Sequence, residues 1–488
     1  MRGSWAVAGV LLLFMSSVAG AQGPVSLTWI PGSSIKLEQV IGDCDWVQWD
    51  ATIDNSPPTC VPTTSQTASR ADVLGAPLGA SFEDDGKLIF LFADTIGATI
   101  GNGDENAYYP TWIDFPNTFE WKARDPIAWS VTERAEDGLL INFFIDGNHA
   151  LAVQPPPQPD GEIVDMGPDD FPGAGINLDG QTYLVCMTGT ISSAQNGGVG
   201  ADYSNDRSVL VKFDQANQTF SSGRTISRVA DGGHFVYVGL HEAALGRFES
   251  SPVHFPEPPV LIFGVGRYWN SNIYLSVIPK SEFWSGVDQN GNNATRYFSG
   301  LKQGRATWSD NESDAVPVVT DLDPSNPTIG NFSVMYSSEL GLWFITFSGG
   351  LHSRTTTGIY FTYATDPWGP WSEPELIFND CRDQGLGNYI RYYYETSADD
   401  FCPSAMPPGP NPAPNGAGPT GPTIGPQTQN DPYTTVGSGF SPQAIERFTK
   451  VKGDELAIYY MMSTWNPYTV VLMRSQFKIK GTPHLPPP

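Results

Sequence analysis

Apolar residues along this chain fall into short runs separated by Gly, Pro and Asn, and stretches with helical periodicity are rare. Runs of this kind predict β-strands. The clearest is 88–92, which is apolar without a break and follows Asp84-Asp85-Gly86, a sequence typical of a tight hairpin turn. It predicts a strand buried on both faces. The other predicted strands are 126–131, 139–145, 182–187, 208–213, 235–238, 260–263, 273–278, 332–336, 343–347, 359–362, 456–462 and 469–473.

These strands cluster in groups that long loops separate. Each group reads as strand, turn, strand, which predicts repeated antiparallel sheets. The sequence therefore predicts an all-β fold, a five-bladed β-propeller. Strands and helices do not alternate, so a TIM barrel or a doubly wound fold is disfavoured. The five groups are 72–132, 137–215, 224–280, 329–378 and 440–480.

Two Pro-rich segments, 153–172 and 402–432, are interpreted as loops inserted in a single domain that spans 22–488. The residues after Pro432 contain two predicted strands but are too few to form a core of their own. They therefore need the rest of the sheet system as a partner, and the chain is expected to be a monomer with one domain.

The N-terminus has the pattern of a secretory signal peptide, which we place at 1–21. Arg2 precedes the apolar run 6–15, and Ala19-Gly20-Ala21 supplies a cleavage site with small residues. No later run is long enough for a transmembrane helix. The mature protein is therefore expected to be secreted, extracellular and not bound to a membrane. Four sequons agree with export and lie at Asn217, Asn293, Asn311 and Asn331.

The five cysteines fit an exported protein. Cys44 and Cys60 flank one irregular loop, and Cys381 and Cys402 flank another, so proximity along the chain favours 44–60 and 381–402 disulfides. Four cysteines allow three connectivities, and the pairing is a hypothesis. Cys186 lies within the predicted strand 182–187 and is expected to be a buried free thiol.

The charge balance excludes two classes of partner. The chain has 52 acidic and 26 basic residues, whereas binding to nucleic acid or anionic membrane needs clustered Lys and Arg. Aromatic residues make up 12% of the chain, which suits a neutral carbohydrate but also an aromatic core. No zinc or nucleotide motif is complete, and the calcium-like spacing at Asp288 lacks the loop's Gly and closing Glu, so we expect no cofactor and no metal.

Two aspartates flank the first predicted strand pair. Asp72 precedes a glycine-rich turn, and Asp94 directly follows the strand 88–92. A carboxylate after a buried strand is costly unless it is paired or functional. Two carboxylates at one end of a β-unit are what a glycosidase needs, one as the acid and one as the base. The alternative is that Asp72 and Asp94 are turn and cap residues.

Several segments resemble one family. They are GASFEDDGKLIFLFADT, GVGRYWNSNIYL, GNFSVMY, TDPWGPWSE and STWNPYTVVLMR, the last with Ser441-Pro442 upstream. Together they cover most of the chain from Asp72 to Met473. They resemble a family long labelled only as a domain of unknown function, some of whose bacterial members are classed as glycoside hydrolases, the endo-D-arabinanases. Two motifs depart from the family pattern: its Gly-Asp-Thr is Ala93-Asp94-Thr95 here, and its Tyr-Arg is replaced by Arg267-Tyr268.

The resemblance implies a propeller whose pocket lies at the central axis, with Asp72 and Asp94 as the catalytic pair of an inverting hydrolase. Three of the substrate-binding candidates also have structural explanations: Asp125 could pair with Arg124 or Arg134, Arg267 could form a structural ion pair, and Asn466 could simply begin a turn. The substrate-binding candidates are Asp125, Arg267, Tyr268, Trp465, Asn466 and Tyr468.

Two functional hypotheses follow. The chain is either a secreted glycoside hydrolase that acts on a furanose polysaccharide such as arabinan, or a carbohydrate-binding propeller, a lectin or adhesin, that lacks the chemistry. The presence of both Asp72 and Asp94 favours the hydrolase. In either case the partner is a polysaccharide.

Overall fold

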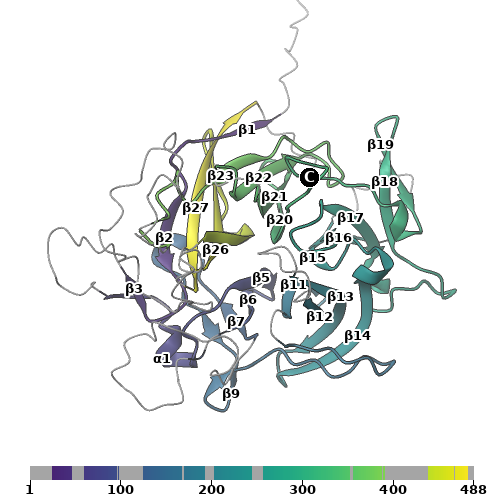
Figure 1. Ribbon diagram of the computed structural model, residues 1–488, viewed down its shortest axis with the longest axis horizontal. Helices are drawn as coiled ribbons and strands as arrows, with labels where there is room; N and C mark the ends of the chain where they lie inside the picture. The colour runs from purple at the N-terminus through teal and green to yellow at the C-terminus, as the bar shows by residue number, and fades with distance from the viewer. Residues whose placement is uncertain are drawn as a thin grey trace, which may run out of the picture.

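The computed structural model describes residues 25–46, 60–95, 97, 125–167, 170–192, 203–243, 257–351, 355–386, 388–390, 438–465 and 468–481. Within them, five antiparallel sheets are arranged around a central axis as the blades of a β-propeller, as predicted (Figure 1). Four of the five blades are meanders, in which strands that follow one another in sequence are neighbours in the sheet.

The blades are built as follows. Blade 1 contains β5 (Leu78–Asp84), β6 (Lys87–Phe92), β7 (Ile127–Ser130) and β8 (Asn142–Phe143), and blade 2 contains β11 (Phe171–Leu178), β12 (Gln181–Ser192), β13 (Tyr203–Asp214) and β14 (Thr219–Arg228). Blade 3 contains β15 (Tyr237–Glu242), β16 (Pro259–Val265), β17 (Tyr274–Pro279), β18 (Arg296–Lys302) and β19 (Arg305–Ser309). Blade 4 contains β20 (Phe332–Ser337), β21 (Leu342–Gly349), β22 (Gly358–Ala364) and β23 (Glu375–Phe378).

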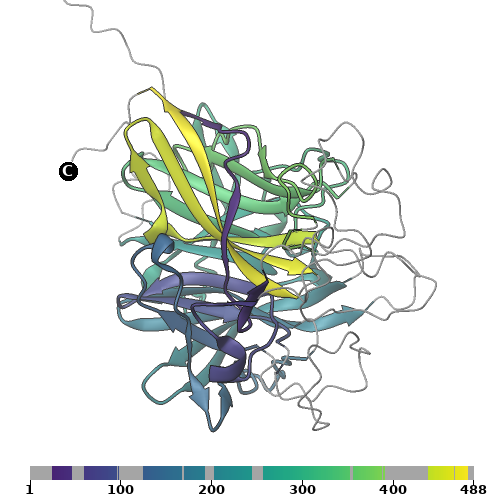
Figure 2. The ribbon, with the colours of Figure 1, turned by 90° about the vertical axis from the view of Figure 1, so that its left-hand side faces the viewer.

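The fifth blade combines strands from both ends of the chain. Its C-terminal strands are β24 (Ser438–Ala444), β25 (Lys450–Lys452), β26 (Glu455–Trp465) and β27 (Thr469–Lys480). The N-terminal strands β1 (Ser26–Trp29) and β2 (Ile35–Gln39) both pair with β27, so the two ends of the chain close the ring (Figure 2). Three small elements precede the first blade: β3 (Cys44–Trp46), β4 (Cys60–Pro62) and the helix α1 (Thr67–Ala71).

The predicted buried strand is confirmed in blade 1. Leu88, at 2% exposure, is the most accessible residue of the run that ends at Phe92. Asp85 and Gly86 both have positive φ, 45° and 78°, as the central residues of a type I′ hairpin require. An unbroken apolar run places hydrophobic side chains on both faces of β6. Neighbouring blades therefore cover this strand on both sides.

The predicted run 139–145 is wrong as one strand. Its middle forms β8 in blade 1, whereas its end forms β9 (Ile145–Asp146), which pairs only with β10 (His149–Ala150). Between them, Phe144 donates its N–H to Ile127 O at 3.1 Å and accepts from Leu151 N at 2.7 Å, so the chain changes partners there. The second predicted group therefore begins too early, because blade 2 starts only at β11.

Glycine lets the innermost strands approach one another. A Cβ at Gly79 in β5 would lie 2.3 Å from the carbonyl oxygen of Pro172 in β11, and one at Gly175 would lie 2.1 Å from the Phe82 ring. Only glycine fits such contacts. The inner strands of blades 1, 2 and 5 also carry β-bulges or register shifts near their starts. Within the described residues, no helix is long and apolar enough to cross a membrane.

Candidate active site

Two aspartates meet at one end of blade 1. Because β6 is antiparallel to both of its neighbours, its last residues lie beside the starts of β5 and β7: Ala93 N donates to Pro77 O at 3.1 Å and Phe92 N to Pro126 O at 3.0 Å. Asp94 and Asp125 therefore become neighbours, and the Asp94 backbone N–H donates to Asp125 Oδ1 at 3.0 Å. The two predicted site residues are brought together by the antiparallel register.

Asp125 is buried and holds Asp94 in an unusual backbone conformation. Asp125 is only 1% exposed, whereas Asp94 is partly exposed. Asp94 has a φ of 37°, in the left-handed region that costs a residue with a side chain about 1–3 kcal/mol. Arg134 pairs with Asp137 at 3.5 Å. Arg124 lies outside the described residues.

Asp72 lies at the C-cap of α1 and contacts a histidine. Its φ is 59°, and its N–H donates to the carbonyl oxygens of Thr67 and Ala68. The hypothesis that Asp72 is a cap residue is therefore confirmed for its backbone. Its side chain contacts His149 on β10, with Asp72 Oδ2 2.9 Å from His149 Nδ1. Asp72 is 9% exposed. Sequence reasoning missed His149, because nothing in the local pattern predicts that the β9–β10 hairpin reaches α1.

The surroundings of Asp72 and Asp94 are linked through the backbone. A Cβ at Gly97, three residues after Asp94, would lie 3.4 Å from Asp72 Oδ2, so the chain that leaves Asp94 passes Asp72. On the other side, Val153 N donates to Asp125 O at 2.9 Å, on the same segment that carries His149. The hydrogen bonds described thus join Asp94 to Asp125 and Asp72 to His149.

A third carboxylate, Asp170, lies at the same end of the propeller and was missed in the sequence. It directly precedes β11, whose start packs on the start of β5, and it is 1% exposed. Its Oδ1 accepts from Asn205 Nδ2 at 2.8 Å. Burial raises the pKa of the Cys186 thiol, and the negative charges of Asp125 and Asp170 raise it further. Both carboxylates therefore lie close enough to Cys186 to act on it electrostatically.

Tyr268 belongs to a buried polar and aromatic chain that continues into blades 3 and 4. Tyr237 donates its hydroxyl to Asn205 Oδ1 at 2.6 Å. Its ring stacks on that of Tyr268, with centroids 4.8 Å apart, and Tyr268 in turn donates to Asn331 Oδ1. Tyr268 is thus held by contacts on both sides.

The other predicted binding residues differ in their placement. Arg267 is exposed. Tyr468 is only 2% exposed, so its ring has almost no accessible surface on which a sugar could stack. The Trp465 side chain and all of Asn466 lie outside the described residues.

Cysteines and possible ligand groups are placed as follows. Cys186 is a free, buried thiol, as predicted. Cys44 and Cys381 are disulfide-bonded, but Cys402 and the Cys60 side chain lie outside the described residues, so both pairings stay predictions. Asp288 uses its carboxylate within its own turn, accepting from the N–H groups of Asn290 and Asn292 at 2.8 and 2.9 Å. In the described part of the chain, no group of three or more His, Cys, Asp or Glu could hold a metal ion.

Comparisons with known proteins find one family whose model matches most of the chain. The model of a family described as "Domain of unknown function (DUF4185)" matches residues 63–474. No curated protein matches the chain. Among solved structures, an endo-1,5-alpha-L-arabinanase from Thermotoga petrophila RKU-1 is similar at 10% identity and a TM-score of 0.36, over 86% of this chain and 77% of that one. An exo-1,5-alpha-L-arabinanase from a bovine ruminal metagenomic library is similar at 9% identity and a TM-score of 0.35, over 83% and 94%. Similarities of this size do not define an activity.

Proposed function

Since the chain belongs to the family described as "Domain of unknown function (DUF4185)", whose name assigns no activity, we propose from its site that it is a secreted glycoside hydrolase. The proposed substrate is a furanose-containing polysaccharide, and the proposed activity resembles that of an endo-D-arabinanase. The substrate class rests on the sequence resemblance of the FADT and STWNPY segments. The chemistry rests on the carboxylates at the end of blade 1.

The observation that supports the chemistry best is the bond from the Asp94 N–H to Asp125 Oδ1 at 3.0 Å. This bond fixes the backbone of a partly exposed aspartate at the end of a rigid, buried strand. A catalytic carboxylate needs such a rigid support, because it must keep a fixed position relative to the substrate. Asp72 lies along the path of the chain that leaves Asp94 and is oriented by His149 at 2.9 Å.

In the proposed mechanism, Asp94 donates a proton to the leaving glycosidic oxygen, and Asp72 accepts a proton from the water that attacks the anomeric carbon. Hydrolysis with inversion needs one protonated and one ionised carboxyl, with room for a water between them. Asp125 is a positioning residue in this scheme, because its carboxylate contacts the Asp94 backbone. No cofactor takes part in these steps.

Exchange of each proposed catalytic aspartate tests the function. Asp72→Asn and Asp94→Asn should each lower the turnover of arabinan by about 10²–10⁴-fold, the usual contribution of a general acid or base, with little change in melting temperature. Asp85→Asn is the matched control, because Asp85 lies in the exposed β5–β6 turn at the other end of the blade and Asn tolerates its φ of 45°.

The assay is the release of reducing ends from a panel of D- and L-arabinans, alongside a pull-down on the same glycans. Wild-type protein that binds arabinan without releasing reducing ends would support the lectin hypothesis instead. A variant at Asp72 or Asp94 that keeps most of the wild-type activity would exclude that residue from the catalytic pair.

A further inference from the structure

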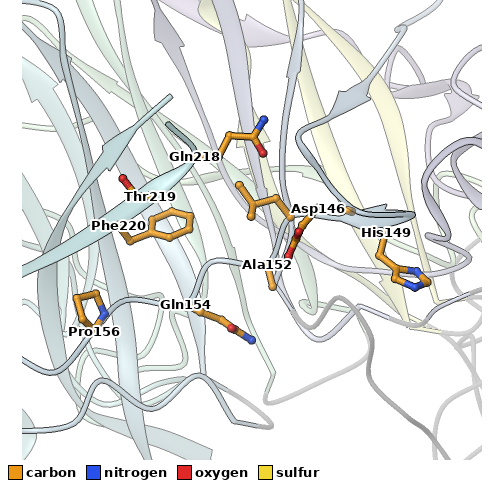
Figure 3. A pocket seen from close by; sticks show the side chains of 10 residues that line it. Asp146, His149, Ala152, Gln154, Pro156, Gln218, Thr219 and Phe220 are labelled. Atoms are coloured by element: carbon orange, nitrogen blue, oxygen red, sulfur yellow. The ribbon is translucent and has the colours of Figure 1, made fainter. Parts of the chain in front are cut away.

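A cavity of about 480 Å³ lies between the β9–β10 hairpin and β14, the outer strand of blade 2, outside the Asp94–Asp125 contact (Figure 3). One side comes from the β9–β10 hairpin and the chain after it, and the other comes from the turn before β14 and its first residues. Its volume is within the range of ligand pockets, about 300–1,000 Å³. The lining includes the side chains of Asp146, His149, Gln154, Gln218, Thr219 and Phe220.

The chemistry of the lining suits a neutral ligand rich in hydroxyl groups. The amides of Gln154 and Gln218 both donate and accept hydrogen bonds, the Thr219 hydroxyl does the same, and the Asp146 carboxylate accepts. Gln154 and Gln218 are exposed. None of the lining residues, all within the described part of the chain, is Lys or Arg, so the cavity offers no basic side chain to a phosphate or carboxylate.

One wall of the cavity is a fixed aromatic ring. Phe220 stacks on Phe213 with centroids 4.9 Å apart and an interplanar angle of 19°, and Phe213 packs edge-on against Phe144 at 5.3 Å. The Phe220 ring is therefore held before any ligand arrives, which reduces the entropy lost when an apolar sugar face packs against it. A hydroxyl-rich ligand with one apolar face matches both the polar and the aromatic part of the lining.

His149 connects this cavity to the proposed catalytic pair. Its ring forms part of the cavity wall, and its Nδ1 lies 2.9 Å from Asp72 Oδ2. A polymer bound at Asp72 therefore has the cavity as its neighbouring space. We propose that the cavity is an additional subsite that binds a furanose residue of the same neutral polysaccharide, outside the two residues that flank the bond that is cleaved; this inference rests on the proposed function.

The test compares oligosaccharides of different length. Binding of an arabinofuranosyl trisaccharide and octasaccharide is measured by titration calorimetry on Asp94→Asn protein, in which cleavage is suppressed. The second protein also carries Asp146→Asn and Gln154→Ala, both at exposed positions. The control carries Gln289→Ala, an exposed glutamine in the turn after β17. The proteins are made in a host that does not N-glycosylate, because the Asn217 sequon includes Gln218 and Thr219.

We expect the octasaccharide to bind about tenfold more tightly than the trisaccharide, a difference of about 1.4 kcal/mol. This gain should disappear in the Asp146→Asn/Gln154→Ala protein and persist in the control. If the gain persists in the double variant, the cavity is not a subsite. If wild-type protein cleaves nothing but the length-dependent binding is lost as expected, the proposed hydrolase function fails and the subsite stands. If no arabinan oligosaccharide binds, both proposals are overturned.

Discussion

Substitutions of Asp125 test whether this residue positions Asp94 or takes part in the proposed chemistry itself. It is 1% exposed and accepts the Asp94 N–H at 3.0 Å. Asp125→Ala removes a hydrogen bond to a charged acceptor, worth about 1.5–3 kcal/mol, and releases a backbone held at a φ of 37°. Asp125→Asn keeps an oxygen at the same place and weakens the bond to the range of neutral pairs, about 0.5–1.5 kcal/mol.

The two variants should therefore differ in turnover. A displacement of a catalytic group by about 1 Å can cost 10²-fold in rate, so Asp125→Ala should lower kcat on arabinan by about 10²-fold. Asp125→Asn should lower kcat by less than about tenfold, since the acceptor remains. KM should change little in either variant, because Asp125 is too buried to contact the substrate extensively.

The assay is steady-state hydrolysis of arabinan with melting temperatures measured in parallel. Asp137→Ala is the control, because Asp137 is an exposed aspartate near the same blade that pairs only with Arg134 among the described salt bridges. If Asp125→Asn is as inactive as Asp125→Ala, the charge of Asp125 takes part in the chemistry and the positioning argument is refuted. If Asp125→Ala keeps wild-type turnover, Asp94 does not depend on this bond.

Three further predictions concern stability and modification. Gly79→Ala should lower the free energy of unfolding by at least about 1–3 kcal/mol in denaturant titration, since its Cβ would lie 2.3 Å from a carbonyl oxygen. The control Gly167→Ala, whose Cβ would have its neighbours at 3.6 Å, should change the free energy of unfolding very little. Equal effects of the two substitutions would contradict the close packing at Gly79. The Tyr459 hydroxyl lowers the pKa of Glu136 to about 2, below the usual 4.5. The stabilisation by ionised Glu136 is therefore present above pH 4.5 and is lost as the pH falls towards 2. The Tyr459→Phe protein should lose less stability than wild-type protein between these pH values. An unchanged pH profile of stability would exclude this coupling. In a glycosylating host, Asn217, Asn293 and Asn311 are exposed and should be modified, whereas Asn331 is buried against Tyr268 and should not be; glycan at Asn331 in peptide mapping would contradict the buried placement.

The hydrophobic pattern of the sequence was sufficient for the fold class and for part of the site. Apolar runs such as 88–92 mark the middle strands of the blades, because these strands are covered on both faces and their burial is visible in the local sequence. The same pattern located Asp94, since a polar residue directly after such a run must lie at the end of a buried strand. Asp125 was a candidate only through the family resemblance, and as a substrate-binding residue.

The tertiary structure decided what local pattern does not record. The inner strands β5, β11 and β24 were not predicted, because close approach of neighbouring blades selects Gly, Pro and Ser there rather than apolar residues. The pairing of β1 and β2 with β27 joins residues from opposite ends of the chain. The Asp72–His149 contact depends on the packing of the β9–β10 hairpin against the end of α1, and the burial of Asp170 depends on the packing of β11 against β5. Contacts between distant segments have no signature in local periodicity, and these contacts set the chemistry of the site.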